Sequence, residues 1–182
     1  MSNMRLQSLK QFFIVVGIAA LFAACADQTP LSPNRQAGNA AQLSAGPGTE
    51  TGSIFATLRR VTARYHDLDV AKNEGFVLLH ECESRPGEGP VGVVYVNFAR
   101  LLDGDINPEL PDALIYEPGP NGLKLAGVEF AVLNTGQPAP QFLGATFQRE
   151  DEFGVYALHA WVWRNNPDGM FAQTNPKVSC EE

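Results

Sequence analysis

An imidazole and two indole rings recur at every second position near the end of the chain. They are His159, Trp161 and Trp163, within the apolar segment Val155–Arg164 (VYALHAWVWR). Alternate residues of an extended strand point to the same side, so the three rings are expected to share one face. Aromatic rings stack on flat ligands, and an imidazole can donate and accept hydrogen bonds. The segment predicts either a wall of a small-ligand pocket or a packed core with a hydrogen-bonded histidine.

Glu129 interrupts the otherwise apolar run LAGVEFAVL. A carboxylate in such a strand needs a partner if it is buried, because burial disfavours its charged form. Pairing with His159 would create an acid–base pair or two metal ligands. The alternative partners of Glu129 are an arginine, such as Arg100 or Arg149, or water if the strand lies at the edge of the sheet. The candidate ligand-binding residues are therefore Tyr95, Glu129, His159, Trp161 and Trp163.

Three other polar clusters are weaker signals of chemistry. In His80–Glu83 (HECE), strand alternation separates the imidazole and thiol from the two carboxylates, which argues against one shared metal ion. His66 precedes two aspartates and is expected on a solvated helix face. Asp103–Asn107 (DGDIN) opens like a calcium loop, but Pro108 and Leu114 replace the required glycine and glutamate. An acidic surface turn is expected there. Nucleotide, metalloprotease and serine-hydrolase motifs are absent, and no cofactor is expected.

A helix and several strands must position these residues. Apolar residues at spacings of three and four predict one amphipathic helix over 53–74, capped by Ser53 and ended by Gly75. Apolar segments between glycine and proline turns predict strands at 76–82, 91–98, 113–116, 123–133, 141–147, 155–164 and 170–173. Asn121-Gly122 predicts a hairpin, and residues 166–169 predict another turn.

The order of these elements predicts the fold class. One helix followed by consecutive strands with short connections indicates an α+β fold with an antiparallel sheet. We expect the helix to pack on a curved sheet of about six strands that forms a half-barrel. A closed barrel of the lipocalin type is the alternative, and it usually needs eight strands.

The N-terminal segment predicts export. Residues 1–24 read as a signal peptide, with basic Arg5 and Lys10 before an apolar run too short to span a membrane. The tetrad FAAC, ending at Cys25, resembles a bacterial lipobox, although Phe22 stands at the usual leucine position. Lipidation of Cys25 would anchor the protein to a membrane surface, as an outer-membrane or cell-surface lipoprotein. Residues 24–26 also form an A-x-A site, whose cleavage would give a soluble periplasmic or secreted protein.

Composition separates a tether from one domain. Residues 25–52 are rich in Gly, Ala and Pro and contain no aromatic residue, so they predict a flexible tether before a single domain at 53–182. A formal net charge of −7 argues against a nucleic-acid partner. Cys82 and Cys180 remain once Cys25 is lipidated, and such a pair in an exported protein predicts one disulfide. Free thiols or a zinc site are the alternatives.

Several stretches resemble a group of uncharacterised bacterial exported proteins. They are ATLRRVTARYHDLDVAKNEGF, GVVYVN, ALIYEP, GVEFAVL and LHAWVWRNNPDGMFAQTNPKVSC, and they span nearly all of residues 55–180. The resemblance implies export and one shared domain, but no particular reaction. In that group the second stretch often reads G-x-H-Y-x-N, whereas this chain has Val94 at the histidine position. The resemblance thus implies that a histidine that could join Glu129 and His159 is missing here.

Three functions follow as hypotheses. The tether, the missing motifs and the aromatic strand favour a surface-tethered module that binds a small, partly apolar ligand. A hydrolytic or metal-assisted envelope enzyme using Glu129 and His159 is the second hypothesis. A structural or interaction protein of the envelope is the third. A pocket that holds Glu129 within hydrogen-bonding reach of His159 would favour the first two.

Overall fold

The computed structural model describes residues 47–180, so the expected signal peptide, Cys25 and most of the expected tether lie outside the described residues. Helix α1 (Pro47–Thr62) begins inside the segment expected to be a tether, and Ser53 lies within it rather than at its start. A 3₁₀ turn, η1 (Ala63–His66), and helix α2 (Leu68–Asn73) follow. None of the described helices is both long and apolar enough to cross a membrane.

The expected single helix is wrong in one respect, because it is broken at Asp67. Asp67 has an extended backbone, and its carboxylate accepts the backbone N–H of Asp69 at 3.0 Å, which caps α2. Short acidic side chains stabilise helix starts in this way and compete with a continuous helix. The end of the helix is as expected: Gly75 has φ +94° and the Phe76 N–H donates to the Ala71 carbonyl, a Schellman motif.

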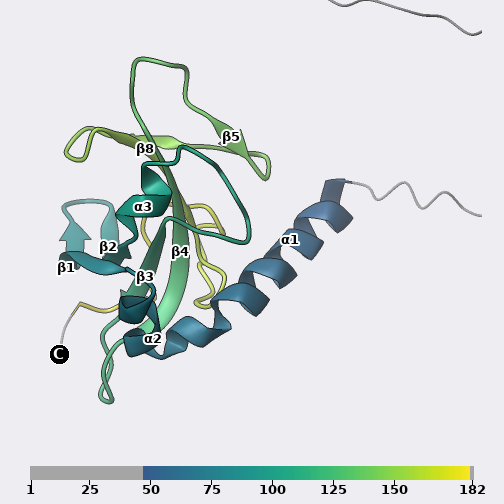
Figure 1. The fold of residues 1–182 in the computed structure, drawn as a ribbon. Helices are drawn as coiled ribbons and strands as arrows, with labels where there is room; N and C mark the ends of the chain where they lie inside the picture. Colours follow the sequence, from purple (N-terminus) through teal and green to yellow (C-terminus); the bar gives the residue numbers. More distant parts are fainter. Residues whose placement is uncertain (1–46, 181–182) are drawn as a thin grey trace, which may run out of the picture. The chain divides into compact units, whose positions relative to one another are not determined.

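Six strands form one antiparallel sheet in the order β1-β2-β3-β4-β8-β7 (Figure 1). A short helix, α3 (Phe98–Leu101), joins the second and third strands. The strands are β1 (Val77–Arg85), β2 (Gly89–Val96), β3 (Ala113–Glu117), β4 (Lys124–Leu133), β7 (Gln148–Glu150) and β8 (Val155–Ala160).

Three strand expectations near the C-terminus need correction. The strand expected at 141–147 is a small hairpin of β5 (Gln141–Phe142) and β6 (Ala145–Thr146), because Leu143 and Gly144 both adopt positive φ and turn the chain. The strand expected at 155–164 ends at Ala160. Residues 170–173 form no strand.

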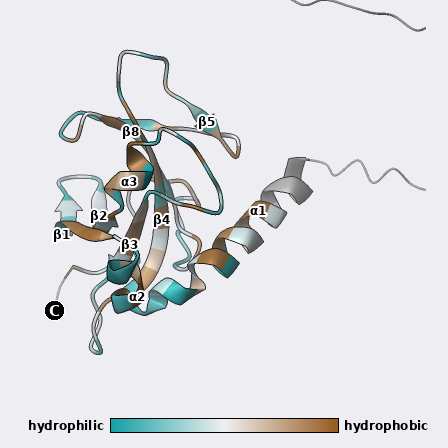
Figure 2. Cartoon of the chain, viewed as in Figure 1, coloured by the Kyte–Doolittle hydropathy of each residue, from teal (hydrophilic) through white to brown (hydrophobic). Residues whose placement is uncertain are grey.

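One side of the sheet packs on the helices, and we call it the helix face. Its core includes Leu58 and Tyr65 from the helical segment and Tyr116, Phe130 and Leu158 from the strands, all buried. In Figure 2 apolar residues, in brown, alternate with polar ones along α1, as expected for a helix with one buried side. Burial of these large side chains is the main stabilising contribution to the fold.

The opposite side is concave, because the two edge strands approach each other across it. Arg85 on β1 donates two hydrogen bonds to Glu150 on β7, at 3.1 and 3.0 Å. His80 on β1 stacks on Phe153, which follows β7, with ring centroids 6.2 Å apart. Side chains rather than a backbone ladder join these two edges. The expected half-barrel is therefore confirmed.

The C-terminal segment fills one end of the concave face. Trp161 and Val178 are buried there, and Trp161 Nε1–H donates to the Ala172 carbonyl at 2.7 Å. A disulfide between Cys82 and Cys180, whose Cα atoms are 5.3 Å apart, ties the end of the segment to β1. The predicted pairing of these two cysteines is thus confirmed. The other end of the concave face is left open.

Candidate functional site

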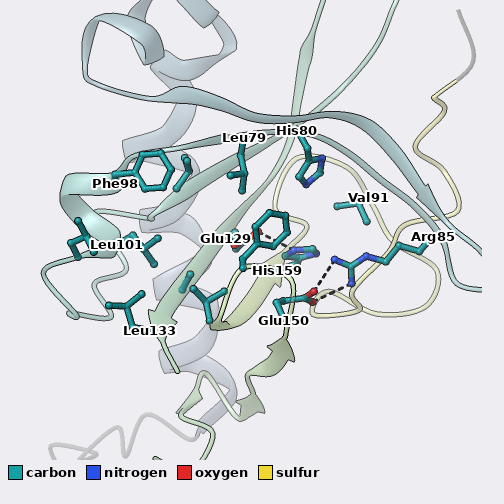
Figure 3. Close-up of a pocket in the computed structure, with 15 residues that line it drawn as sticks. Leu79, His80, Arg85, Val91, Phe98, Leu101, Glu129, Leu133, Glu150 and His159 are labelled. Carbon is teal, nitrogen blue, oxygen red and sulfur yellow. Dashed lines mark hydrogen bonds and ion pairs between the residues drawn. The ribbon is translucent and has the colours of Figure 1, made fainter. Parts of the chain in front are cut away.

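A cavity of about 210 Å³ occupies the open end of the concave face. One side of it is apolar and the other side is charged (Figure 3). Phe98, Leu101 and Leu133 lie on the apolar side, while the Arg85–Glu150 pair lies on the charged side. The complete lining is Leu79, His80, Arg85, Val91, Val96, Phe98, Leu101, Leu102, Glu129, Ala131, Leu133, Glu150, Phe153, Val155 and His159.

Two of the predicted site residues meet in this cavity. Glu129 on β4 is directly opposite His159 on β8 in the antiparallel register. His159 Nε2 lies 3.0 Å from Glu129 Oε2. The side chain of His159 is 3% exposed and that of Glu129 is 13% exposed. The partner of Glu129 is therefore the histidine, and not Arg100 or Arg149.

The hydrogen bonds of His159 determine how many protons the pair holds. Its Nδ1 lies 2.7 Å from the carbonyl oxygen of Gln173, which can only accept, so Nδ1 carries a hydrogen. The contact between Nε2 and Glu129 Oε2 then needs one further proton, carried by either atom. The pair is thus an imidazolium with a carboxylate, or a neutral imidazole with a carboxylic acid. In both forms its net charge is zero.

A second buried carboxyl group lies beside this pair. The Asp112 residue is 1% exposed, and its Oδ2 accepts the backbone N–H of Ala131 at 2.9 Å. Its Oδ1 has no hydrogen-bond partner among the described residues. Burial, and next the nearby charges of Glu129 and Asp103, raise the pKa of Asp112 to about 7, against a partial lowering by the Ala131 hydrogen bond and Arg100. The Glu129–His159 pair, which forms the polar floor of the cavity, thus adjoins a carboxyl group with a pKa near neutral pH.

The three predicted aromatic residues do not line the cavity. Tyr95 lies on the helix face, where its ring packs edge-on against Tyr116 at 5.7 Å. Trp161 shares the face of His159, with ring centroids 6.0 Å apart, but fills the end covered by the C-terminal segment. Trp163 packs against the helix-face core instead, and its Nε1–H donates to Thr62 at 3.0 Å.

The displacement of Trp163 has a local cause. The strand ladder ends at Ala160, and the Val162 N–H donates back to the Ala160 carbonyl at 2.9 Å. Both Trp163 and Arg164 then donate to the Ala126 carbonyl. This tight turn breaks the alternation of faces, so the expectation that three rings share one face is correct only for His159 and Trp161.

The weaker clusters also have defined places. His80 lines the mouth of the cavity, and Cys82 next to it is in the disulfide. His66 packs edge-on against Trp163, with ring centroids 4.5 Å apart. Asp103 accepts the Asp105 N–H at 2.8 Å in an exposed turn. Across residues 47–180, no three His, Cys, Asp or Glu side chains are grouped so that they could hold a metal ion.

Sequence reasoning missed the Arg85–Glu150 pair, Asp112 and Phe153. Arg85 and Glu150 are 65 residues apart, and their meeting depends on the curl of the sheet. Asp112 follows Leu110-Pro111 just before β3, in a context without a local sign of burial. The only sequence signal for Phe153 was its position as an apolar residue directly after an acidic turn.

Comparisons with protein-family models, characterised proteins and solved structures found no match.

Proposed function

We propose that this protein is an exported lipoprotein of the cell envelope whose domain binds a small, partly apolar ligand in the half-barrel cavity. The observation that carries the proposal is a cavity of about 210 Å³ with the pair of partly exposed Glu129 and buried His159 as its polar floor. Pockets with an apolar lining and a few convergent polar groups are the usual form of small-molecule sites. The Cys82–Cys180 bond supports the export part of the proposal, since disulfides persist in oxidising compartments.

Native mass spectrometry tests the binding part. The protein is exported through its own signal, purified without reductant and weighed under native and denaturing conditions. We expect an organic mass that is lost on denaturation. Ala131 lines the cavity, so Ala131→Leu should fill it and abolish the extra mass. The matched control is Leu110→Ser, an exposed residue outside the cavity, which should retain it. Equal native and denatured masses in the parent protein would contradict the proposal.

Fractionation of cells tests the anchor. Cys25→Ser removes the thiol that would carry the lipid and should move the protein from the membrane fraction to the soluble fraction. The control is Cys82→Ser, which removes a cysteine of the disulfide and keeps Cys25, and it should leave the protein with the membranes. Identical fractionation of the parent and Cys25→Ser would contradict lipidation.

A second candidate is an enzyme that uses Glu129 and His159 for acid–base chemistry. It is favoured by the single proton held between Glu129 Oε2 and His159 Nε2 at the floor of an accessible cavity. Glu129→Gln separates the two functions. A binding protein should keep its ligand, because the amide can donate to a neutral imidazole. An enzyme should lose turnover by at least a hundredfold, since an amide cannot exchange that proton.

A further inference from the structure

The polar floor of the cavity offers one unused hydrogen-bonding atom. Glu129 Oε2 is engaged with His159, whereas Oε1 of the same carboxyl group has no hydrogen-bond partner within residues 47–180. Glu129 lines the cavity and is partly exposed. Oε1 is therefore the atom of this pair that a ligand can reach.

Oε1 accepts hydrogen bonds in both forms of the Glu129–His159 pair. If the shared proton is on His159, Oε1 belongs to a carboxylate and accepts hydrogen bonds. If the proton is on Oε2, Oε1 is the carbonyl oxygen of a carboxylic acid and again accepts. Because the Gln173 carbonyl holds the hydrogen of Nδ1, the proton has no third place within the pair. A complementary ligand must then present a donor to Oε1.

The carboxylates and the guanidinium that line the cavity are already paired. Glu129 is neutralised by His159, and both terminal nitrogens of Arg85 donate to Glu150. The Arg85 Nε lies 3.6 Å from Glu83, so this guanidinium has no free edge for an anion. A charged ligand would lose its hydration without gaining an opposite charge. The cavity thus favours an uncharged ligand.

The volume of the cavity indicates the size of the ligand, and the residues at its mouth indicate that the rest of the ligand is apolar. A dry cavity of about 150 Å³ accommodates benzene, and sites for drug-sized molecules start at about 300 Å³. The cavity of about 210 Å³ lies between them, which suits one ring with a small substituent. Leu102 and Phe98 at its mouth are 64% and 48% exposed, and Leu133 and Phe153 are also exposed. An apolar molecule can therefore approach along apolar surface.

We infer that the cavity takes an uncharged, mainly apolar molecule of single-ring size with a hydroxyl group, a phenol or an alcohol of similar shape. Its O–H donates to Glu129 Oε1 while its ring occupies the side lined by Phe98, Leu101 and Leu133. This inference rests on the proposed binding function and names the ligand class for the same site.

The test is an NMR titration with four probes that share one ring. The full chain carries Cys25→Ser, so that no detergent competes for the cavity. p-Cresol has a donor, 4-methylanisole has only an acceptor, toluene has neither, and 4-methylbenzoate is an anion. We expect p-cresol to bind about tenfold more tightly than toluene and 4-methylanisole. We expect no measurable binding of 4-methylbenzoate.

Two variants test the geometry of the site. Glu129→Gln should keep the preference for p-cresol within about threefold, because an amide that donates to His159 leaves its carbonyl oxygen toward the cavity. Ala131→Leu should abolish binding of every probe. Because the probe series uses the unaltered cavity, its result does not depend on whether a variant folds.

The outcomes separate this inference from the binding function. Equal affinities for p-cresol, 4-methylanisole and toluene would overturn the inference and leave the binding function standing. Tighter binding of 4-methylbenzoate than of p-cresol would also overturn the inference and leave the binding function standing. Failure of all probes, with an organic mass still found by native mass spectrometry, would show that the ligand class is wrong. Failure of the probes together with equal native and denatured masses would overturn both.

Discussion

The two faces of one sheet fill their space in different ways. On the helix face, β3 and β4 contribute large side chains such as Tyr116 and Phe130, which are buried against the helices. On the concave face the same region of the sheet contributes Gly127, Ala131 and Ala157. Side chains alternate between faces along a strand, so the sizes of alternate residues determine how each face is filled. Small residues on the concave face thus leave space that large side chains fill on the helix face, and Ala131 is the one of these three that lines the cavity.

The faces also treat polar groups differently. On the helix face, the Tyr116 hydroxyl donates to the Tyr65 carbonyl at 2.8 Å, a neutral and fully internal hydrogen bond. On the concave face, the Glu129–His159 pair keeps one oxygen without a hydrogen-bond partner among the residues that the structure describes. The first arrangement stabilises packing, and the second leaves a capacity for binding.

Adjacent residues on opposite faces give the strongest test of this comparison. Phe130 is buried on the helix face and packs against Phe142 at 5.0 Å, so Phe130→Ala should lower the free energy of unfolding by about 4 kcal/mol. Ala131→Leu should lower it by less than about 1 kcal/mol, since the added atoms enter an existing cavity. Urea unfolding of both variants measures this. Similar losses for both would contradict the difference between the faces.

The pKa of Asp112 predicts a pH dependence of stability. It is about 7 in the folded protein against an ordinary value of 3.8, so the folded state retains a proton that the unfolded chain releases. Stability should therefore fall as pH rises from about 4 to 7, by up to about 4 kcal/mol, and Asp112→Asn should remove this part of the slope. Urea unfolding at several pH values measures the effect. Exposed Asp105→Asn is the control, and parallel curves for the parent and Asp112→Asn would refute the prediction.

The disulfide tests whether the C-terminal segment holds the concave face in place. Cys82 and Cys180 are separated by 98 positions, so replacing both with alanine should lower stability by about 3 kcal/mol. The loss should affect the covered end first, seen as faster hydrogen exchange at the Trp161 indole, while Phe130 and the helix face stay protected. Uniform acceleration across both faces would show that the segment has no special role.

Gly127 tests how closely β4 packs against the C-terminal segment. A Cβ atom there would lie 3.0 Å from the Ala160 carbonyl and 3.3 Å from the Trp161 ring, so Gly127→Ala should lower stability by about 2 kcal/mol. The matched control is Gly52→Ala in α1, where a Cβ meets nothing within 4 Å and helix propensity favours alanine. Thermal unfolding compares the two. A melting temperature unchanged in Gly127→Ala would mean that Trp161 can move away from β4.

Local patterns were sufficient for most of the fold. Apolar alternation located β2, β3, β4 and β8 to within a few residues, and Asn121-Gly122 lies in the β3–β4 connection, where Gly122 has φ +100°. These features depend on near neighbours, so their signal lies in short stretches of chain. The disulfide followed from cysteine count and the expectation of export.

In the candidate site, too, local sequence patterns predict some features and the fold determines the others. The apolar run around Glu129 is enough to predict that this carboxylate needs a partner, and His159 is one of the candidates. The register that places the two residues opposite each other is a property of the folded sheet. The turn of Trp163 to the helix face and the meeting of Arg85 with Glu150 also arise only in the fold. Those outcomes depend on where a ladder ends and how far a sheet curls, which are set by contacts between residues distant in the chain.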